Sequence, residues 1–270
     1  MPIFLMHFPD PVKSIIARSI VSFLPASEWY SAAVRISRLL ARMMRWTHYR
    51  NDPGKDIIET SVLKSLLQII SSLGKPFPIP VRTLGAEAVL EAWNHPRGTV
   101  ICSVHLPLWN SILGSLVELN CSPTAVLGGG RPDGKLLVFG SIVELPSLPI
   151  NQCILIKAQR ILRSGGSVAT VIDTCLGNPL NPNILKLVGS VGARAVFATT
   201  ELDENGEILI RFSNPPDPFC KSDQSIQSYL EYFQARIDHV LGFSEWAPEN
   251  DEEISYSHPE SDDSRSQPTF

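Results

Sequence analysis

The sequence predicts an α/β fold in which helices flank a mostly parallel central sheet, preceded by an N-terminal helical region. From residue 99 onward, short apolar runs alternate with segments of helical periodicity, the pattern of parallel strands joined by helical crossovers. The 270 residues are 44% hydrophobic and only 19% charged, which is enough apolar material for a substantial core. These two observations exclude a wholly disordered chain.

Residues 1–80 are expected to form helices that pack on the α/β domain and on a membrane surface. Helices are predicted over 11–24, 27–46 and 56–73. Pro25 ends the first helix, Ser27 is a candidate N-cap for the second, and Gly74 ends the third. The proline-rich segment 76–80 that follows excludes further helix.

The remaining predicted elements alternate along residues 81–246, which we assign to the α/β domain. Helices are expected over 85–93, 108–119, 151–163, 183–191 and 225–241. Strands are expected over 99–104, 124–127, 167–172, 195–200 and 208–212. Asn205-Gly206 is a hairpin-turn signature between the last two strands, so the final strand should form an antiparallel edge.

Charge is distributed unevenly along the chain, although the formal net charge is only −4. Residues 1–50 hold seven bases and two acids, whereas residues 247–270 hold seven acids and one arginine. Because residues 247–270 also contain almost no aliphatic side chains, we predict a disordered acidic tail there. A basic end on a near-neutral body argues against a nucleic-acid partner and favours an anionic membrane surface.

Arginines recur along the helix predicted over 27–46 at spacings of 3, 4 and 3, so they share one helix face. They are Arg35, Arg38, Arg42 and Arg45. The opposite side carries apolar side chains, namely Ile36, Leu39, Leu40, Met43, Met44 and Trp46. This helix is either an ordinary amphipathic helix with a solvated basic face, or an interfacial helix whose apolar side contacts the acyl chains of anionic lipids.

Cysteine usage and targeting signals bear on the compartment. The five cysteines are irregularly spaced without a C-x-x-C pair, and the histidines are isolated, so no metal site or redox motif is indicated. An odd number of cysteines leaves at least one free thiol, which favours a reducing compartment. No signal peptide and no apolar stretch of transmembrane length is found. We therefore expect a cytoplasmic protein, either soluble or peripheral on a membrane.

The segment from His105 to Asn110 is the candidate catalytic site. His105 follows the predicted strand 99–104, and ligands of open α/β sheets bind at that edge. Asn110, about one turn into the next helix, is expected to orient the imidazole, so that the other ring nitrogen acts as a general base. The alternative is a hydrogen-bonded structural histidine beside an asparagine without a partner. Signatures of serine hydrolases, dinucleotide-binding folds and P-loops are absent from the sequence.

The stretch Ser103-Val104-His105-Leu106-Pro107-Leu108-Trp109-Asn110 resembles the His-x4-Asp/Glu motif of the lysophospholipid acyltransferase superfamily. It is most similar to the lipid A late acyltransferases, which transfer lauroyl or myristoyl groups. Arg131-Pro132 and the segment 162–173 resemble further parts of those enzymes, and the likeness extends over about residues 10–246.

This resemblance implies an acyltransferase that moves a fatty acyl group to a hydroxyl or amine of a lipid-like or small acceptor. The donor would be a thioester of acyl carrier protein or coenzyme A, with no bound cofactor, at the inner face of the cytoplasmic membrane. His105 and Asn110 would form the catalytic dyad, and Arg131, Asp173 and Trp109 would bind substrate. From the residues alone, Arg131 can equally be a solvated loop cation and Asp173 a cap of the following turn.

The sequence departs from the family pattern in two places. Asn110 replaces the acidic member of the dyad and cannot stabilise an imidazolium by charge. The Phe-Phe-Gly-type loop expected after Asp173 is missing, which indicates an acceptor other than standard lipid A. The alternative function is therefore a catalytically inert relative that binds acyl chains or serves as a scaffold.

Overall fold

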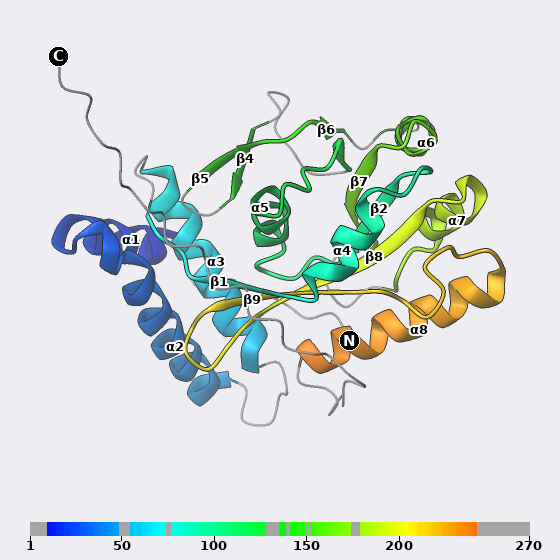
Figure 1. The fold of residues 1–270 in the computed structure, drawn as a ribbon. Coiled ribbons are helices and arrows are strands. Elements are labelled where there is room, and N and C mark those ends of the chain that lie inside the picture. The colour runs from blue at the N-terminus through cyan, green and yellow to red at the C-terminus, as the bar shows by residue number, and fades with distance from the viewer. Residues whose placement is uncertain are drawn as a thin grey trace, which may run out of the picture.

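A computed structural model describes residues 10–48, 55–73, 77–127, 135–138, 141–149, 151, 153–173 and 179–241. Figure 1 shows a central sheet with helices on both faces, so the α/β fold class is confirmed. The predicted tail, 247–270, lies outside the described residues. Among the helices that are described, none is both long enough and apolar enough to cross a bilayer.

Seven strands form the main sheet in the order β1-β9-β8-β2-β7-β3-β6. They are β1 (Val81–Leu84), β2 (Thr99–Ser103), β3 (Ala125–Leu127), β6 (Ser147–Leu148), β7 (Ser167–Val171), β8 (Arg194–Leu202) and β9 (Ile208–Ser213). Neighbouring strands run parallel except for β8 and β9, which are joined by the predicted Asn205-Gly206 turn. A separate antiparallel hairpin consists of β4 (Lys135–Val138) and β5 (Ser141–Glu144), which the sequence did not predict.

The helices are α1 (Asp10–Phe23), α2 (Trp29–His48), α3 (Lys55–Ser72), α4 (Ala86–Trp93), α5 (Asn110–Glu118), α6 (Ile154–Arg163), α7 (Asn183–Val191) and α8 (Asp223–Val240). Their positions agree with the predicted ranges. The proposed N-cap role of Ser27 is wrong, because 26–28 form a separate 3₁₀ turn and α2 begins at Trp29. That turn is closed by a hydrogen bond from the Glu28 amide to the Pro25 carbonyl.

The expected position of the last strand at the edge of the sheet is also wrong. Strand β9 lies between β8 and β1, and β1 pairs with it in parallel. The amide of Ile208 donates to the carbonyl of Pro80 at 3.0 Å, so the proline-rich segment leads directly into this pairing. The prolines exclude helix but keep the chain extended, which suits a short edge strand.

Strand residues alternate between two hydrophobic clusters, one on each face of the sheet. Ile101 packs in the cluster that contains residues of α1 to α5, whereas Val100 and Cys102 pack in the cluster that contains residues of α6 to α8. The N-terminal helices thus share a continuous core with one face of the sheet, while α6, α7 and α8 cover the other face (Figure 1).

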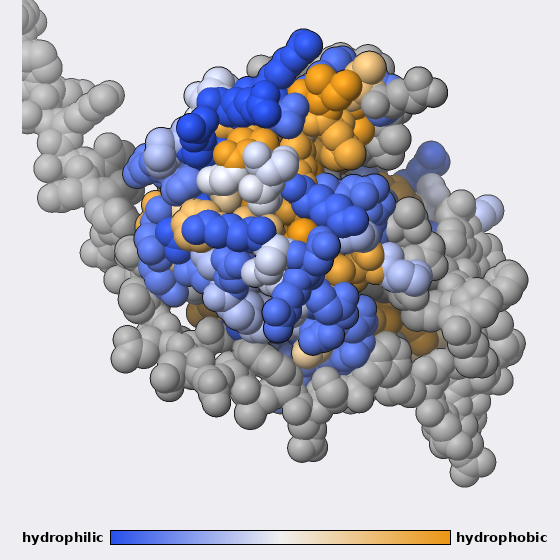
Figure 2. Space-filling view, turned by 90° about the vertical axis from the view of Figure 1, so that its right-hand side faces the viewer, coloured by the Kyte–Doolittle hydropathy of each residue, from blue (hydrophilic) through white to orange (hydrophobic). Residues whose placement is uncertain are grey.

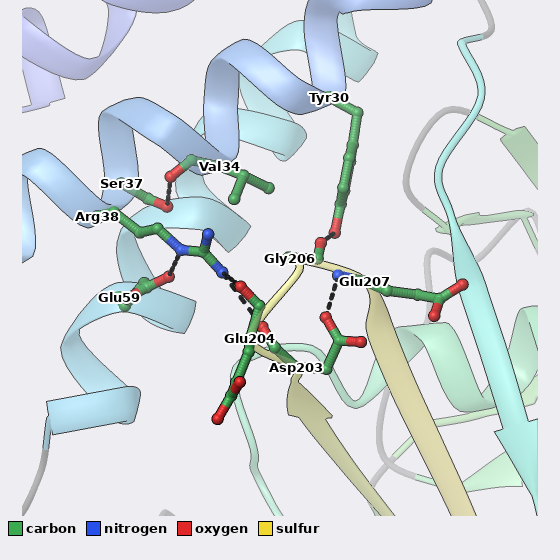
Figure 3. A network of polar contacts seen from close by, with 9 residues as sticks. All are labelled: Tyr30, Val34, Ser37, Arg38, Glu59, Asp203, Glu204, Gly206 and Glu207. Carbon is green, nitrogen blue, oxygen red and sulfur yellow. Dashed lines mark hydrogen bonds and ion pairs between the residues drawn. The ribbon is translucent and has the colours of Figure 1, made fainter.

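Helix α2 is fastened to the tip of the β8–β9 hairpin (Figure 3). The hydroxyl of Tyr30 donates to the carbonyl of Gly206 at 2.6 Å. Gly206 has φ +88°, and a Cβ there would lie 2.7 Å from Cγ1 of Val34, so this close contact requires glycine. The glycine of the hairpin turn therefore also allows the close packing of α2 against the turn.

Arg38 takes part in the same attachment. Its Nε donates to Oε1 of Glu59 on α3 at 2.8 Å, and its Nη2 donates to the carbonyls of Asp203 and Glu204 (Figure 3). The idea of one solvated face carrying all four arginines is therefore wrong for Arg38. Arg35 and Arg42 are exposed, and the side chain of Arg45 lies outside the described residues.

Candidate active site

The register of two neighbouring strands brings His105 and Asp173 together. Strands β2 and β7 run parallel, and Ser103 lies opposite Val171 in the last pair of the ladder. Two residues beyond each of these positions, the chain reaches His105 and Asp173. The ladder continues past the strands, since the amide of Ile172 donates to the carbonyl of Ser103 at 2.8 Å. Both side chains therefore lie at the carboxyl edge of the sheet, where ligands bind in open α/β folds.

The two residues form a histidine–carboxylate pair. Nδ1 of His105 lies 2.9 Å from Oδ1 of Asp173. The backbone amide of His105 also donates to the same carboxylate, at 2.9 Å to Oδ1 and 3.2 Å to Oδ2. The Asp173 side chain is 2% exposed, whereas that of His105 is 40% exposed. A buried, firmly held carboxylate thus supports an imidazole that solvent and substrate can reach.

This geometry determines the tautomer of the neutral ring. An ionised carboxylate can only accept hydrogen bonds, so Nδ1 of His105 carries the proton that is donated to Asp173. Nε2 then holds a lone pair, and no described residue forms a hydrogen bond with it. An imidazole in this state can take a proton from an incoming group and later return it.

A tight turn between β2 and α5 fixes the backbone of His105. The side chains of Leu106 and Leu108, which follow the histidine in the turn, are buried, each with 1% exposure. The amide of Leu106 donates to the carbonyl of Val104 at 2.7 Å, and the amide of Trp109 donates to the carbonyl of Leu106 at 3.1 Å. These anchors hold the backbone on either side of the histidine.

Asn110 does not orient His105, and this part of the sequence prediction is wrong. Nδ1 of the ring is already paired with Asp173. The Oδ1 atom of Asn110 is buried and forms no hydrogen bond within the described structure. Asn110 is the first residue of α5, beyond the turn. The carboxylate comes instead from the neighbouring strand.

The other predicted site residues have different outcomes. Trp109 is half-buried and packs against both hydrophobic clusters. Asp173, expected to contact substrate, directs both carboxylate oxygens to His105. Arg131 lies outside the described residues. The described residues contain no group of three or more His, Cys, Asp or Glu side chains arranged to hold a metal ion.

Among the described residues, the cysteine and serine side chains near the end of β2 are not arranged as nucleophiles. Burial raises the pKa of the Cys102 thiol to about 12, so this thiol stays protonated at neutral pH. Ser103 is buried, and its Oγ donates to the carbonyl of Val104. Within the described residues, His105 therefore has a carboxylate partner but no hydroxyl or thiol hydrogen-bonded to its ring.

No protein-family model matches the chain, and no curated protein matches it. The resemblance to acyltransferases therefore depends only on the sequence motif around His105 and on the segments that precede and follow it. The structure shows the contact between His105 and Asp173, which the motif does not predict.

Proposed function

We propose that this protein is an acyltransferase that moves a fatty acyl group from an acyl thioester to a hydroxyl or amine acceptor. The observation that carries the proposal is the His105–Asp173 pair at the carboxyl edge of the parallel sheet. Such a pair provides a general base of defined tautomer, which is what deprotonation of an alcohol or amine at neutral pH requires. The thioester carrier is acyl carrier protein or coenzyme A.

The reaction follows from the position of the proton on the ring. Nε2 of His105 accepts the proton of the acceptor hydroxyl or amine as its oxygen or nitrogen attacks the thioester carbonyl carbon. The C–S bond then breaks, and the leaving thiolate takes the proton back from Nε2. Asp173 stabilises the transient imidazolium by charge and holds the ring in place. No net proton is gained or lost by the protein.

Within the part of the chain that the structure describes, no serine or cysteine is hydrogen-bonded to the His105 ring, and this suits direct transfer to the acceptor. Among the described residues, none is hydrogen-bonded to Nε2. A covalent acyl-enzyme would need a serine or cysteine activated by that nitrogen. The acceptor's own hydroxyl or amine is therefore the nucleophile in our proposal.

The carboxylate of Asp173 also bears on the inert alternative. That alternative depended on Asn110 replacing the acidic residue of the family motif. Asp173 supplies a carboxylate to the histidine ring from another strand, so the substitution at 110 does not leave His105 without an acid. This arrangement favours an enzyme over a binding protein.

We further propose that the protein acts peripherally at the inner face of the cytoplasmic membrane. Large apolar side chains are exposed on the first two helices, with Ile15 and Phe23 on α1 and Leu39 and Met43 on α2. Phe23 is 83% exposed. Exposed arginines lie on the same helices, and this combination suits an interface with anionic lipid.

The test is acyl transfer by the purified full-length chain. Lauroyl thioesters of acyl carrier protein and of coenzyme A are offered with a membrane lipid extract, and acylated products are identified by mass spectrometry. We expect His105→Ala to abolish product formation, whereas His95→Ala, at a half-buried histidine outside the site, leaves it intact. A wild-type rate in His105→Ala would refute the proposal.

A further inference from the structure

One exposed helix surface outside the active site combines basic and apolar side chains. On α6, Leu155 and Ile156 are 38% and 52% exposed. Three exposed bases follow on the same helix, namely Lys157, Arg160 and Arg163. The helix contains no acidic residue, and no described residue forms an ion pair with any of these bases. We call these five residues the α6 surface.

The buried side of α6 explains why Ile156, Arg160 and Arg163 face outward. Ala158 and Leu162 are fully buried in the cluster beneath the helix, and Ile154 and Ile161 pack against that cluster. Ile156, Arg160 and Arg163 are spaced i, i+4 and i+7, so they form one line on the outer side. Figure 2 shows hydrophobic side chains beside strongly hydrophilic ones on the upper part of this face, where α6 lies.

The topology places the apolar end of α6 at the same sheet edge as the active site. The chain leaves β6 at the carboxyl edge of the sheet and enters β7 at the amino edge, so α6 runs back between these edges. A Cβ on Gly98, just before β2, would lie 3.0 Å from the Cα of Leu162, which places the last turn of α6 at the amino edge. Leu155 and Ile156 in the first turn therefore lie towards the edge that carries His105.

The α6 surface and the proposed membrane surface lie on opposite faces of the sheet. Helices α1 and α2 belong to one hydrophobic cluster and α6 to the other. Figure 1 shows α1 and α2 at one end of the molecule and α6 at the other. A flat bilayer that contacts α1 and α2 lies away from α6, which leaves the α6 surface free to bind a second partner.

We propose that the α6 surface docks an acidic carrier protein that delivers the acyl thioester to His105. This inference rests on the proposed function. The bases, which form no ion pair with a described residue, complement acidic side chains, and the exposed Leu155 and Ile156 provide an apolar contact nearest the site. A thioester at the end of a flexible arm then reaches over the carboxyl edge of the sheet. Between the two donors considered, this surface selects the protein carrier over coenzyme A.

The experiment measures binding of fluorescently labelled acyl carrier protein to the full-length chain by anisotropy. The test variant is Lys157→Glu/Arg160→Glu, and the control is Arg97→Glu/Lys221→Glu, which makes the same charge change at exposed bases outside α6. We expect the test variant to raise Kd about tenfold at low salt, with the difference falling as salt is added. The control should bind like the wild type. Ile156→Ser is expected to weaken binding with little dependence on salt.

Two further arms separate the sources of negative charge. Vesicles of phosphatidylcholine and phosphatidylglycerol test lipid, and lauroyl coenzyme A tests a small phosphate-bearing donor. The inference is overturned if the test variant loses vesicle binding but keeps carrier binding. It is also overturned if the KM of the test variant for lauroyl coenzyme A rises as much as its KM for the lauroyl carrier. Equal binding of the carrier by both double variants would overturn it as well.

The outcome for α6 is distinguishable from that for the proposed function. His105→Ala should retain carrier binding, because the docking surface and the base are separate. Carrier binding that depends on α6, without transfer from any thioester, would refute the acyltransferase proposal and leave the docking surface standing. Acyl transfer from the carrier that depends on His105 but is unaffected by the α6 variant would refute the docking surface and support the acyltransferase proposal.

Discussion

His105 and Asp173 are 68 residues apart in the sequence, yet Nδ1 of the histidine lies 2.9 Å from Oδ1 of the aspartate. The same carboxylate accepts hydrogen bonds from the backbone amide of His105, so it fixes both the main chain and the ring. The separation of 68 equals the offset between paired residues throughout the β2–β7 ladder, such as Ser103 and Val171. Parallel register therefore brings the two residues side by side at the end of the strands.

Replacing Asp173 by Asn tests the importance of this carboxylate. The amide keeps the side-chain shape but carries no charge, so the imidazolium loses its stabilisation. We expect kcat to fall by up to about 10⁴-fold, the cost of the equivalent change in a serine protease triad. The rate is measured by thioester-dependent product formation. Asp238→Asn on α8 is the control, and a wild-type rate in Asp173→Asn would contradict the assigned role.

Asn110→Asp distinguishes the observed pair from the one that the motif predicts. Oδ1 of Asn110 is buried without a partner, so a carboxylate there has no donor to compensate its desolvation. We expect no gain in rate and a loss of about 1–3 kcal/mol in the free energy of unfolding. Urea denaturation measures the loss, with exposed Asn183→Asp as the control. An increase in kcat for Asn110→Asp would instead support a dyad within the motif.

The sequence indicated His105 because a buried strand ends immediately before it, and this local signal needs no knowledge of strand order. It also indicated Asp173, which follows another strand in the same way. The pairing of these residues was missed because adjacency of β2 and β7 is a property of the sheet and not of either segment. Asn110 was favoured instead because it is close in sequence.

At α2, helical periodicity likewise could not show which side chains contact a distant part of the chain. The spacing predicted the four arginines on one side of the helix, but it could not show which of them meets another element. Arg38 pairs with Glu59 and with the tip of a hairpin more than 160 residues away. The long-range partner, rather than the helix itself, determines that Arg38 faces the protein while Arg35 and Arg42 remain exposed.

The exposed arginines of α2 provide a test of membrane association. Reversing both in Arg35→Glu/Arg42→Glu should weaken binding to phosphatidylglycerol vesicles by at least about tenfold, because each base near an anionic surface contributes about 1 kcal/mol. Co-sedimentation with vesicles measures the binding, and Arg97→Glu/Lys221→Glu is the charge-matched control. Equal vesicle binding by both double variants would exclude α2 as the lipid-contacting helix.

Tyr30→Phe tests how strongly α2 is attached to the β8–β9 hairpin. The substitution removes the 2.6 Å hydrogen bond and leaves the Gly206 carbonyl without that donor. We expect the free energy of unfolding to fall by about 1–3 kcal/mol in urea denaturation. Tyr232→Phe on α8, which removes the hydroxyl that accepts from Arg236, gives a comparison with a less buried tyrosine.

The pH dependence of the Tyr30 contribution has a definite sign. Burial, assisted by the nearby carboxylates of Asp203 and Glu207, raises the pKa of Tyr30 well above its usual value of 10.0. The folded state therefore favours the protonated phenol. Its contribution is complete below the unfolded-state pKa and declines as pH rises from there through the folded-state pKa. The stability difference between wild type and Tyr30→Phe should thus be constant from pH 6 to about 9 and shrink above about pH 10. A difference that shrinks between pH 6 and 8 would show that another titrating group controls this contact.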